Sequence, residues 1–243
     1  VTVNEKYMTL LNIPLKALIL STSSSLLLGF SPVVAGESAV QPNILFILTD
    51  DQGYGDLEAH GHPYLQTPHT NQLREESVRF DNFYVSPPCS PTRAALLTGQ
   101  HEFRNAVTHT LQPREHLFKD AVTLPQLFKN NGYFTQGIGK IFHNWRQDDY
   151  KGDAPSWSVP QLMHYNSHGN DRAQVEGELP PDLTDIPKCE IRDVPDSAYF
   201  DGRIADLAVK ALREVKDKQF FLAVGFWKPH SHFNAPKRYW DLY

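Results

Sequence analysis

The chain has 243 residues, of which 40% are hydrophobic, so it can bury one sizeable core, and one main domain is the default expectation. Its formal net charge is −5 and no basic tract stands out, so it lacks the electrostatic footprint of a nucleic-acid-binding protein. Two cysteines permit at most one disulfide, which excludes a disulfide-stapled scaffold.

The N-terminal residues predict export. Lys6 and Lys16 precede an apolar run over residues 17–30. The small residues that follow, up to Ala35, are typical of a cleavage site. We interpret residues 1–35 as a signal peptide and 36–42 as a leader, and expect a periplasmic or secreted protein. A membrane anchor is the alternative, but the serine-interrupted run is short for a span of about 20 apolar residues, so no stable membrane association is expected.

The first predicted strand is a continuous apolar run over residues 43–49, which indicates burial on both faces. It ends abruptly in two acids, Asp50 and Asp51. A helix is predicted over 67–77, and a partly alternating pattern over 78–85 predicts a second strand.

Cys89 follows this second strand in a turn that feeds a helix. The two prolines before Cys89 forbid a helix there, and Ser90 can cap the N-terminus of a helix that follows. Pro91 suits the first helical position, and Gly99 suits the end of the helix. A helix N-terminus favours an anion and a charged or polarised sulfur or oxygen. Arg93 opposes the helix dipole there, which suggests that something anionic binds between it and Cys89.

A third strand is expected after another helix. Thr123 and Gln126 form a capping-box sequence, and Gly132 supplies the helix stop. Residues 133–139 then predict a strand.

The remaining chain completes one domain over residues 43–243. Residues 144–195 are rich in Pro, Gly, Asp and Asn without a sustained period, so we interpret them as an irregular excursion near the site. Residues 204–215 show the clearest amphipathic helical spacing, and 220–226 predict the last strand.

This alternation of strands and helices predicts an α/β fold with a largely parallel sheet, whose ligands gather beyond the carboxyl ends of the strands. Three predicted strands end in ionisable side chains, and this coincidence predicts a site there. The side chains are Asp50 and Asp51, Lys140 and His143, and Lys228 and His230.

Each candidate also has an ordinary alternative. The adjacent aspartates fit a hard divalent ion, but also a turn or a helix cap. Cys89 is either a functional position or a buried small residue, or it pairs with Cys189. Lys140 and His143 could be a surface lysine and a packed histidine, and the spacing of His230 and His232 is by itself a weak metal signal.

One motif carries a resemblance to a known family. Residues 89–93, Cys-Ser-Pro-Thr-Arg, followed by Leu-Thr-Gly at 97–99, match the C-x-P-x-R signature of the formylglycine-dependent (type I) sulfatases. Residues 43–51 resemble that family's first strand with its paired metal aspartates. Residues 139–143, Gly-Lys-Ile-Phe-His, are similar to its Gly-Lys-x-x-His segment.

The resemblance spans about residues 43–243 and is greatest to the iduronate-2-sulfatase branch, through residues 220–230 and the trailing Pro236-Lys237. It implies an alkaline-phosphatase-like α/β fold, with a largely parallel sheet flanked by helices. It also implies a sulfuric ester hydrolase that removes sulfate from a sulfated carbohydrate.

The family pattern can be carried over by residue. Cys89 would be oxidised to formylglycine by a formylglycine-generating enzyme, and its hydrated aldehyde would be the nucleophile. Asp50 and Asp51 would hold a calcium ion that also contacts the modified Cys89. Arg93 and Lys140 would neutralise sulfate oxygens or orient the aldehyde hydrate.

Two histidines complete the implied set. His143 would hold or deprotonate the second hydroxyl of the hydrate, and His230 would donate a proton to the leaving alcohol.

The family's remaining metal ligands and a further lysine come from beyond the position that matches Tyr243. We therefore expect an incomplete fragment, truncated at the C-terminus, with little sulfatase turnover and weak calcium affinity. The alternatives are a formylglycine-dependent phosphonate or phosphodiester hydrolase, and a catalytically incomplete carbohydrate-binding remnant.

Overall fold

The structure is a computed structural model that describes residues 41–105, 107, 120–143, 153–163, 172–177 and 189–243. The predicted signal peptide, most of the predicted leader and much of the predicted excursion at 144–195 lie outside the described residues.

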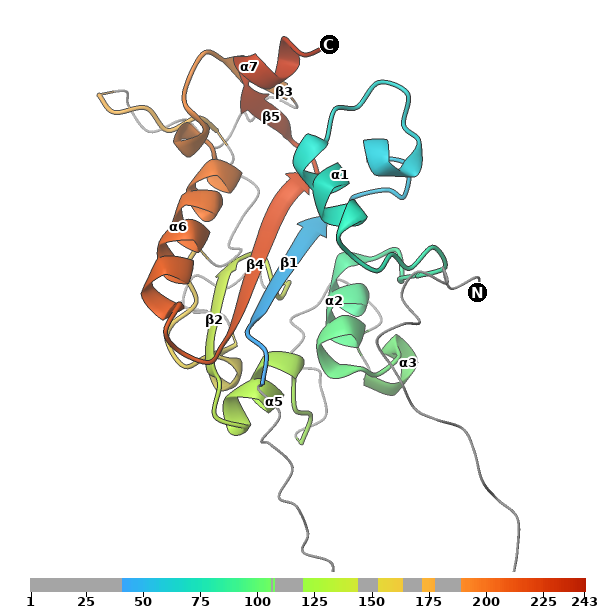
Figure 1. The fold of residues 1–243 in the computed structure, drawn as a ribbon, viewed down its shortest axis with the longest axis vertical. Helices are drawn as coiled ribbons and strands as arrows, with labels where there is room; N and C mark the ends of the chain where they lie inside the picture. Colours follow the sequence, from blue (N-terminus) through green and yellow to red (C-terminus); the bar gives the residue numbers. More distant parts are fainter. Residues whose placement is uncertain (1–40, 106, 108–119, 144–152, 164–171, 178–188) are drawn as a thin grey trace, which may run out of the picture. The chain divides into compact units, whose positions relative to one another are not determined.

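A parallel sheet forms the centre of the described fold, as the sequence predicts. Its strands are β1 (Ile44–Asp50), β4 (Phe220–Pro229) and β2 (Phe134–Gly139), in the order β1-β4-β2 (Figure 1). The last strand of the three in sequence is therefore the middle one, and its first six residues are all buried. This order brings the carboxyl ends of all three strands to one edge.

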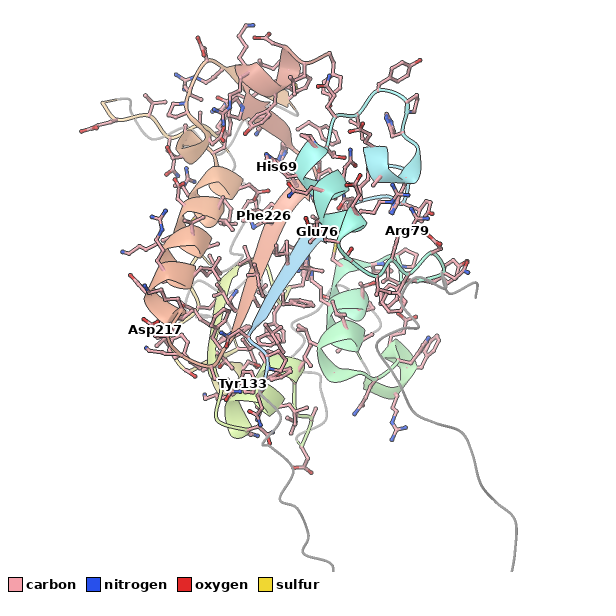
Figure 2. All side chains as sticks on the ribbon, in the orientation of Figure 1. His69, Glu76, Arg79, Tyr133, Asp217 and Phe226 are labelled. Carbon is pink, nitrogen blue, oxygen red and sulfur yellow. The ribbon has the colours of Figure 1, made fainter. Side chains whose placement is uncertain are left out.

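One face of the sheet packs against α6 (Phe200–Val215), the amphipathic helix that the sequence predicts. Its apolar side meets side chains of β4 and β2 in one cluster (Figure 2). The buried members include Ile204, Ala208, Ala211, Val215, Ile138, Leu222 and Val224.

The opposite face packs against α2 (Cys89–Thr98) and α5 (Leu124–Asn130). The predicted capping box is confirmed at the start of α5, where the Thr123 side chain accepts the N–H of Gln126. Tyr133 lies beside α5, with its ring 4.9 Å from that of Phe128 (Figure 2).

The prediction that β1 is buried on both faces is wrong for the described residues. Leu45 is 45% and Ile47 is 55% exposed, although both lie on the sheet face that α6 covers elsewhere. The reason is that α6 packs on β4 and β2 only, and within the described residues no other helix covers this face of β1.

The predicted strand at 78–85 is also absent. These residues form bends and irregular backbone, with Val78 81% and Tyr84 87% exposed. A strand is stabilised by pairing, and no described strand runs beside this segment. Alternating apolar residues therefore do not suffice to make one here.

The remaining described elements are short. A second, two-stranded sheet pairs β3 (Cys189–Arg192) with β5 (Phe233–Pro236), so a strand lies inside the region predicted as irregular. The others are η2 (Glu58–His60), α1 (Pro68–Glu75), α3 (Glu102–Asn105), η3 (Ala154–Ser156), η5 (Asp196–Ala198) and α7 (Lys237–Trp240). None of the helices in the described ranges has the length and apolarity needed to cross a bilayer.

Candidate active site

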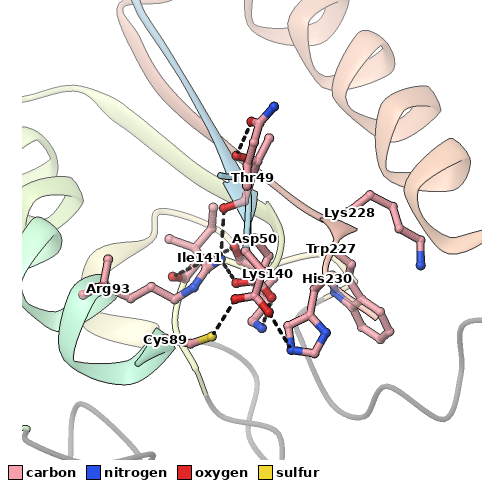
Figure 3. A network of polar contacts seen from close by, with 12 residues as sticks. Thr49, Asp50, Cys89, Arg93, Lys140, Ile141, Trp227, Lys228 and His230 are labelled. Atoms are coloured by element: carbon pink, nitrogen blue, oxygen red, sulfur yellow. Dashed lines mark hydrogen bonds and ion pairs between the residues drawn. The ribbon is translucent and has the colours of Figure 1, made fainter. Parts of the chain in front are cut away.

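The candidate site lies where the three parallel strands end (Figure 3). Asp50 is the last residue of β1, Lys140 follows β2, and His230 follows β4. Cys89 opens α2 and faces the same point. The structure thus brings together side chains that the sequence spreads from position 50 to position 230.

Asp50 is the most buried acid of the site, with 3% of its surface exposed. Its Oδ1 accepts a hydrogen bond from Arg93 Nη2 at 2.8 Å, and its Oδ2 forms an ion pair with Lys140 Nζ. Burial alone would raise the pKa of Asp50, but the charges of Arg93 and Lys140 outweigh it and lower that pKa. Asp50 is therefore an ionised carboxylate held by two cations.

Arg93 is fixed by backbone carbonyls as well as by this carboxylate. Its Nη1 donates to the carbonyl oxygens of Lys140 at 2.6 Å and Ile141 at 3.0 Å. The anion that Arg93 meets in the structure is Asp50, and since α2 begins at Cys89, Arg93 lies just beyond its first turn, where the helix dipole opposes a cation less.

Lys140 is fully buried, and its place depends on a close backbone approach. Its N–H donates to the carbonyl of Gly225 at 2.8 Å, and a Cβ on Gly225 would lie 1.9 Å from the Lys140 carbonyl oxygen. Only glycine fits at that distance, so Gly225 lets β2 and β4 converge under the site. Burial lowers the pKa of Lys140, while Asp50 opposes that shift.

Asp51 turns the chain out of β1 with a positive φ of 57°, a conformation that aspartate tolerates better than most residues. Its side chain is 47% exposed. Oδ1 accepts a hydrogen bond from Cys89 Sγ at 3.4 Å, and Oδ2 lies 3.4 Å from His230 Nε2. Asp51 therefore links the cysteine to the histidine.

Cys89 begins α2 itself, with Pro88 as N-cap, so the helix starts before the predicted Ser90 cap. The predicted stop is confirmed, since Gly99 adopts a left-handed φ of 64°. The sequence predicts a charged or polarised sulfur or oxygen here, and the surroundings disfavour the charged form of an unmodified thiol. Burial, followed by the negative charge of Asp50, raises the pKa of Cys89 to about 11, which keeps the unmodified side chain protonated. Both Cys89 and Cys189 are free cysteines in the structure.

The two predicted site histidines have different surroundings. His143 is 6% exposed, and burial together with the charges of Lys140 and Arg93 lowers its pKa to about 3, so its ring is neutral. His230 has a partly exposed ring, and its backbone N–H donates to the carbonyl of Asp50 at 3.0 Å.

One group of side chains has the spacing of a metal site. Ligand atoms of Asp50, Asp51, Cys89 and His230 all lie within 4.8 Å of one another. Carboxylate oxygens suit a hard cation such as calcium, so Asp50 and Asp51 fit the ion that the family resemblance implies, while the thiol and the imidazole are not ligands that calcium prefers. The sequence analysis gives His230 only the role of proton donor, and its proximity to Asp51 becomes visible only in the fold. His232 does not belong to the group.

A cavity of about 410 Å³ opens beside three members of this group, Asp50, Asp51 and Cys89, and His230 is not part of its lining. Its lining includes Asp50, Asp51, Cys89 and Arg93, together with apolar side chains such as Phe83. This volume lies within the range of ordinary small-molecule sites, and the mixture of charged and apolar walls is typical of them.

Comparison with known proteins agrees with this geometry. The family model described as Sulfatase matches residues 42–243. Iduronate 2-sulfatase from Mus musculus is 34% identical over 240 residues, which cover 91% of this chain and 42% of that protein. The Homo sapiens iduronate 2-sulfatase is 32% identical over 210 residues, which cover 83% of this chain and 37% of that protein. The chain thus spans less than half the length of these relatives.

Solved structures show the same fold. The protein BT4656, in complex with its substrate D-glucosamine-2-N,6-O-disulfate, superposes with a TM-score of 0.51 at 25% identity, over 78% of this chain and 35% of that one. PsFucS1 sulfatase from Pseudoalteromonas sp. superposes with a TM-score of 0.55 at 23% identity. The superposition covers 78% of this chain and 44% of that one. The family match, which covers more than half of the sequence, and the alkaline-phosphatase-like fold place this chain in the sulfatase family.

Proposed function

We propose that the protein is a sulfuric ester hydrolase that removes sulfate from a sulfated carbohydrate in the manner of an iduronate 2-sulfatase. Its nucleophile would be a formylglycine made from Cys89, with a calcium ion beside it. The observation that carries this proposal is the convergence of Asp50, Asp51, Cys89 and His230, whose ligand atoms lie within 4.8 Å of one another.

The charge balance of the site supports an anionic substrate. Arg93 and Lys140 offset Asp50 and Asp51, and His143 is neutral, so the described groups sum to about zero. When held by Asp50, Asp51 and the modified Cys89, calcium would supply Lewis-acid stabilisation of charge on the ester oxygens. A divalent ion would give the site a net positive charge, which suits a sulfate group.

The state of Cys89 supports its modification. With its pKa raised to about 11, the thiol is almost fully protonated near neutral pH, and the thiolate is the nucleophilic form. An unmodified Cys89 would therefore be a poor nucleophile in this pocket. Oxidation by a formylglycine-generating enzyme would replace it with a group whose reactivity does not depend on a thiolate.

The other residues have roles that match their surroundings. Arg93 and Lys140 hold Asp50, so two positive charges lie behind this carboxylate, which lines the cavity together with Arg93. His143 is neutral, so its ring can accept a hydrogen bond from a hydroxyl on residue 89, although its low pKa makes it a weak proton acceptor. His230, with its ring partly exposed, is placed to donate a proton to the leaving alcohol.

The relatives support a sugar substrate. Iduronate 2-sulfatases are among the chain's curated relatives, and the solved neighbour BT4656 binds a disulfated glucosamine. The signal-peptide pattern of residues 1–35 supports a periplasmic or secreted enzyme.

A paired hydrolysis assay tests this proposal. The protein, produced together with a formylglycine-generating enzyme, is given 4-nitrophenyl sulfate and a matched 4-nitrophenyl phosphodiester, with Cys89→Ala as the control variant. Because the chain spans less than half the length of its iduronate 2-sulfatase relatives, we expect only slow hydrolysis of the sulfate ester. This hydrolysis should require calcium and be lost in Cys89→Ala. Preference for the diester would instead identify a phosphodiester hydrolase, and equal activity of Cys89→Ala would exclude residue 89 as the nucleophile.

A further inference from the structure

A further carboxylate, Asp201, contacts the segment that carries His230. Asp201 lies in the first turn of α6. Its Oδ1 accepts a hydrogen bond from the backbone N–H of Trp227 at 2.9 Å, and its Oδ2 accepts one from the backbone N–H of Lys228 at 2.9 Å. Each carboxylate oxygen therefore holds one of two consecutive amides. The sequence gives no sign of this contact, because an acid in a first helical turn is common.

These two amides lie where the sheet is interrupted. Regular pairing of β4 with both neighbours ends at Gly225, and pairing with β1 resumes only at Pro229. Trp227 and Lys228 fall inside this interruption, and the Trp227 residue is 2% exposed. Buried backbone N–H groups require acceptors, and Asp201 supplies them at this point.

The start of α6 is fixed firmly enough to hold the strand end in place. A Cβ on Gly202 would lie 1.9 Å from the carbonyl oxygen of Asp196, so only glycine permits this packing of α6 against η5. The rings of Phe200 and Trp227 stack with their centroids 3.9 Å apart. Asp201 therefore projects from a helix end that is already packed against the end of β4.

The same segment is held on its other side by the site itself. The N–H of His230 donates to the carbonyl of Asp50 at 3.0 Å, and His230 Nε2 lies 3.4 Å from Asp51 Oδ2. Residues 227–230 thus run between Asp201 on one side and the end of β1 on the other. A shift at Trp227 or Lys228 would move the imidazole relative to Asp51.

We propose that Asp201 is a positioning residue for His230, fixing residues 227–230 so that the imidazole faces the reacting group. This inference rests on the proposed function, in which His230 protonates the leaving alcohol. The competing explanation is that Asp201 only stabilises the start of α6 through the helix dipole.

Hydrogen exchange separates these explanations in the full chain. Asp201→Asn replaces one acceptor oxygen with a donor, and Asp206→Asn is the matched control, because Asp206 is an exposed acid on the same helix. We expect amide exchange at Trp227, Lys228 and His230 to be faster by about tenfold or more in Asp201→Asn, given the strength of hydrogen bonds to charged acceptors. The amide of Leu222, in the middle of β4, should exchange at the wild-type rate in Asp201→Asn. In Asp206→Asn all amides should do so. Uniformly faster exchange along α6, with residues 227–230 unchanged, would overturn the proposal.

The dependence of kcat on the leaving group of the ester provides a second test, because a mere loss of protein stability would lower kcat equally for all esters. If His230 supplies the proton, Asp201→Asn should lower kcat for an alkyl sugar sulfate by at least about tenfold, because its alcohol needs protonation. The effect on 4-nitrophenyl sulfate should be small, since its phenol leaves as an anion. His230→Ala should show the same pattern. An equal loss of kcat on both esters would contradict a positioning role.

The two proposals can fail separately. A wild-type protein that hydrolyses neither ester would count against the proposed function, while the exchange rates at Trp227 and Lys228 would still decide whether Asp201 holds this segment. If Asp201→Asn does not fold, Asp201→Glu takes its place, since it keeps the charge and displaces the carboxylate by one methylene. Wild-type leaving-group dependence and exchange in Asp201→Glu would overturn the proposal.

Discussion

The site has two halves that differ in how their charges are satisfied. In the inner half, Asp50 is 3% exposed and bonded to Arg93 and Lys140. In the outer half, the adjacent Asp51 has a side chain that is 47% exposed, and it contacts Cys89 and His230 at 3.4 Å. Neighbouring carboxylates thus have opposite roles. The inner one completes a buried ion network as well as belonging to the candidate metal group, while the outer one belongs to that group and is open to solvent.

The largest expected effect comes from breaking the inner half. Asp50→Asn would leave Arg93 and Lys140 buried without a counter-charge, which we expect to destabilise the protein by about 3–5 kcal/mol. Asp51→Asn is the matched control and should change the free energy of unfolding by less than about 1 kcal/mol. Urea denaturation of both variants measures the difference. Equal destabilisation would show that the two halves are not distinct.

Acid should weaken the inner half through His143. Its pKa of about 3 in the folded state lies below the ordinary 6.5, so the unfolded chain binds its proton more tightly. The stability from neutral His143 is complete above pH 6.5 and is lost as the pH falls toward 3. The slope should reach about 1.4 kcal/mol per pH unit. His143→Gln should flatten this part of the profile of unfolding free energy against pH, and an unchanged profile would contradict a buried neutral histidine.

Overpacking beneath the inner half should have a smaller effect. A Cβ on Gly225 would lie 1.9 Å from the Lys140 carbonyl oxygen, so Gly225→Ala must push β2 and β4 apart. We expect a loss of about 1–3 kcal/mol, measured as a lower melting temperature. Gly55→Ala is the control, because no atom lies within 4 Å of the place that its new methyl group would take, and the melting temperature should stay nearly unchanged. A similar loss in both variants would mean that the approach of the strands is not what Gly225 permits.

The outer half should respond to calcium. At a calcium concentration ten times the dissociation constant, the wild-type protein should gain about 1.4 kcal/mol of stability, because the ion binds the folded state alone. Asp51→Asn replaces a charged carboxylate of the candidate metal group with a neutral amide. The variant should therefore require more calcium for the same gain in stability. Thermal denaturation across a calcium titration measures this shift. An identical calcium dependence in Asp51→Asn would remove Asp51 from the ion site.

The residues that end the strands could be predicted from the sequence, since a continuous apolar run that stops at Asp50 marks both a strand and its carboxyl end. Three such ends converge once the sheet is parallel. The protonated state of Cys89 could not be predicted in this way. It depends on burial and on Asp50, which lies far earlier in the chain, and the helix-start pattern taken alone favours the opposite charge state.

The errors have a common cause. The apolar patterns of Ile47 and of residues 78–85 indicate burial and strand, but both outcomes depend on which other elements pack alongside. Asp201 escapes sequence analysis for the same reason, because its partners Trp227 and Lys228 lie 26 and 27 positions away along the chain. Local pattern thus locates the side chains, and tertiary packing sets their charge states and partners.

Mass spectrometry of the peptide that contains Cys89, from the protein in its native host, tests the central claim most directly. We expect residue 89 to have lost its sulfur and to carry an aldehyde oxygen, as a formylglycine would. An intact thiol at residue 89, or a disulfide with Cys189, would contradict it.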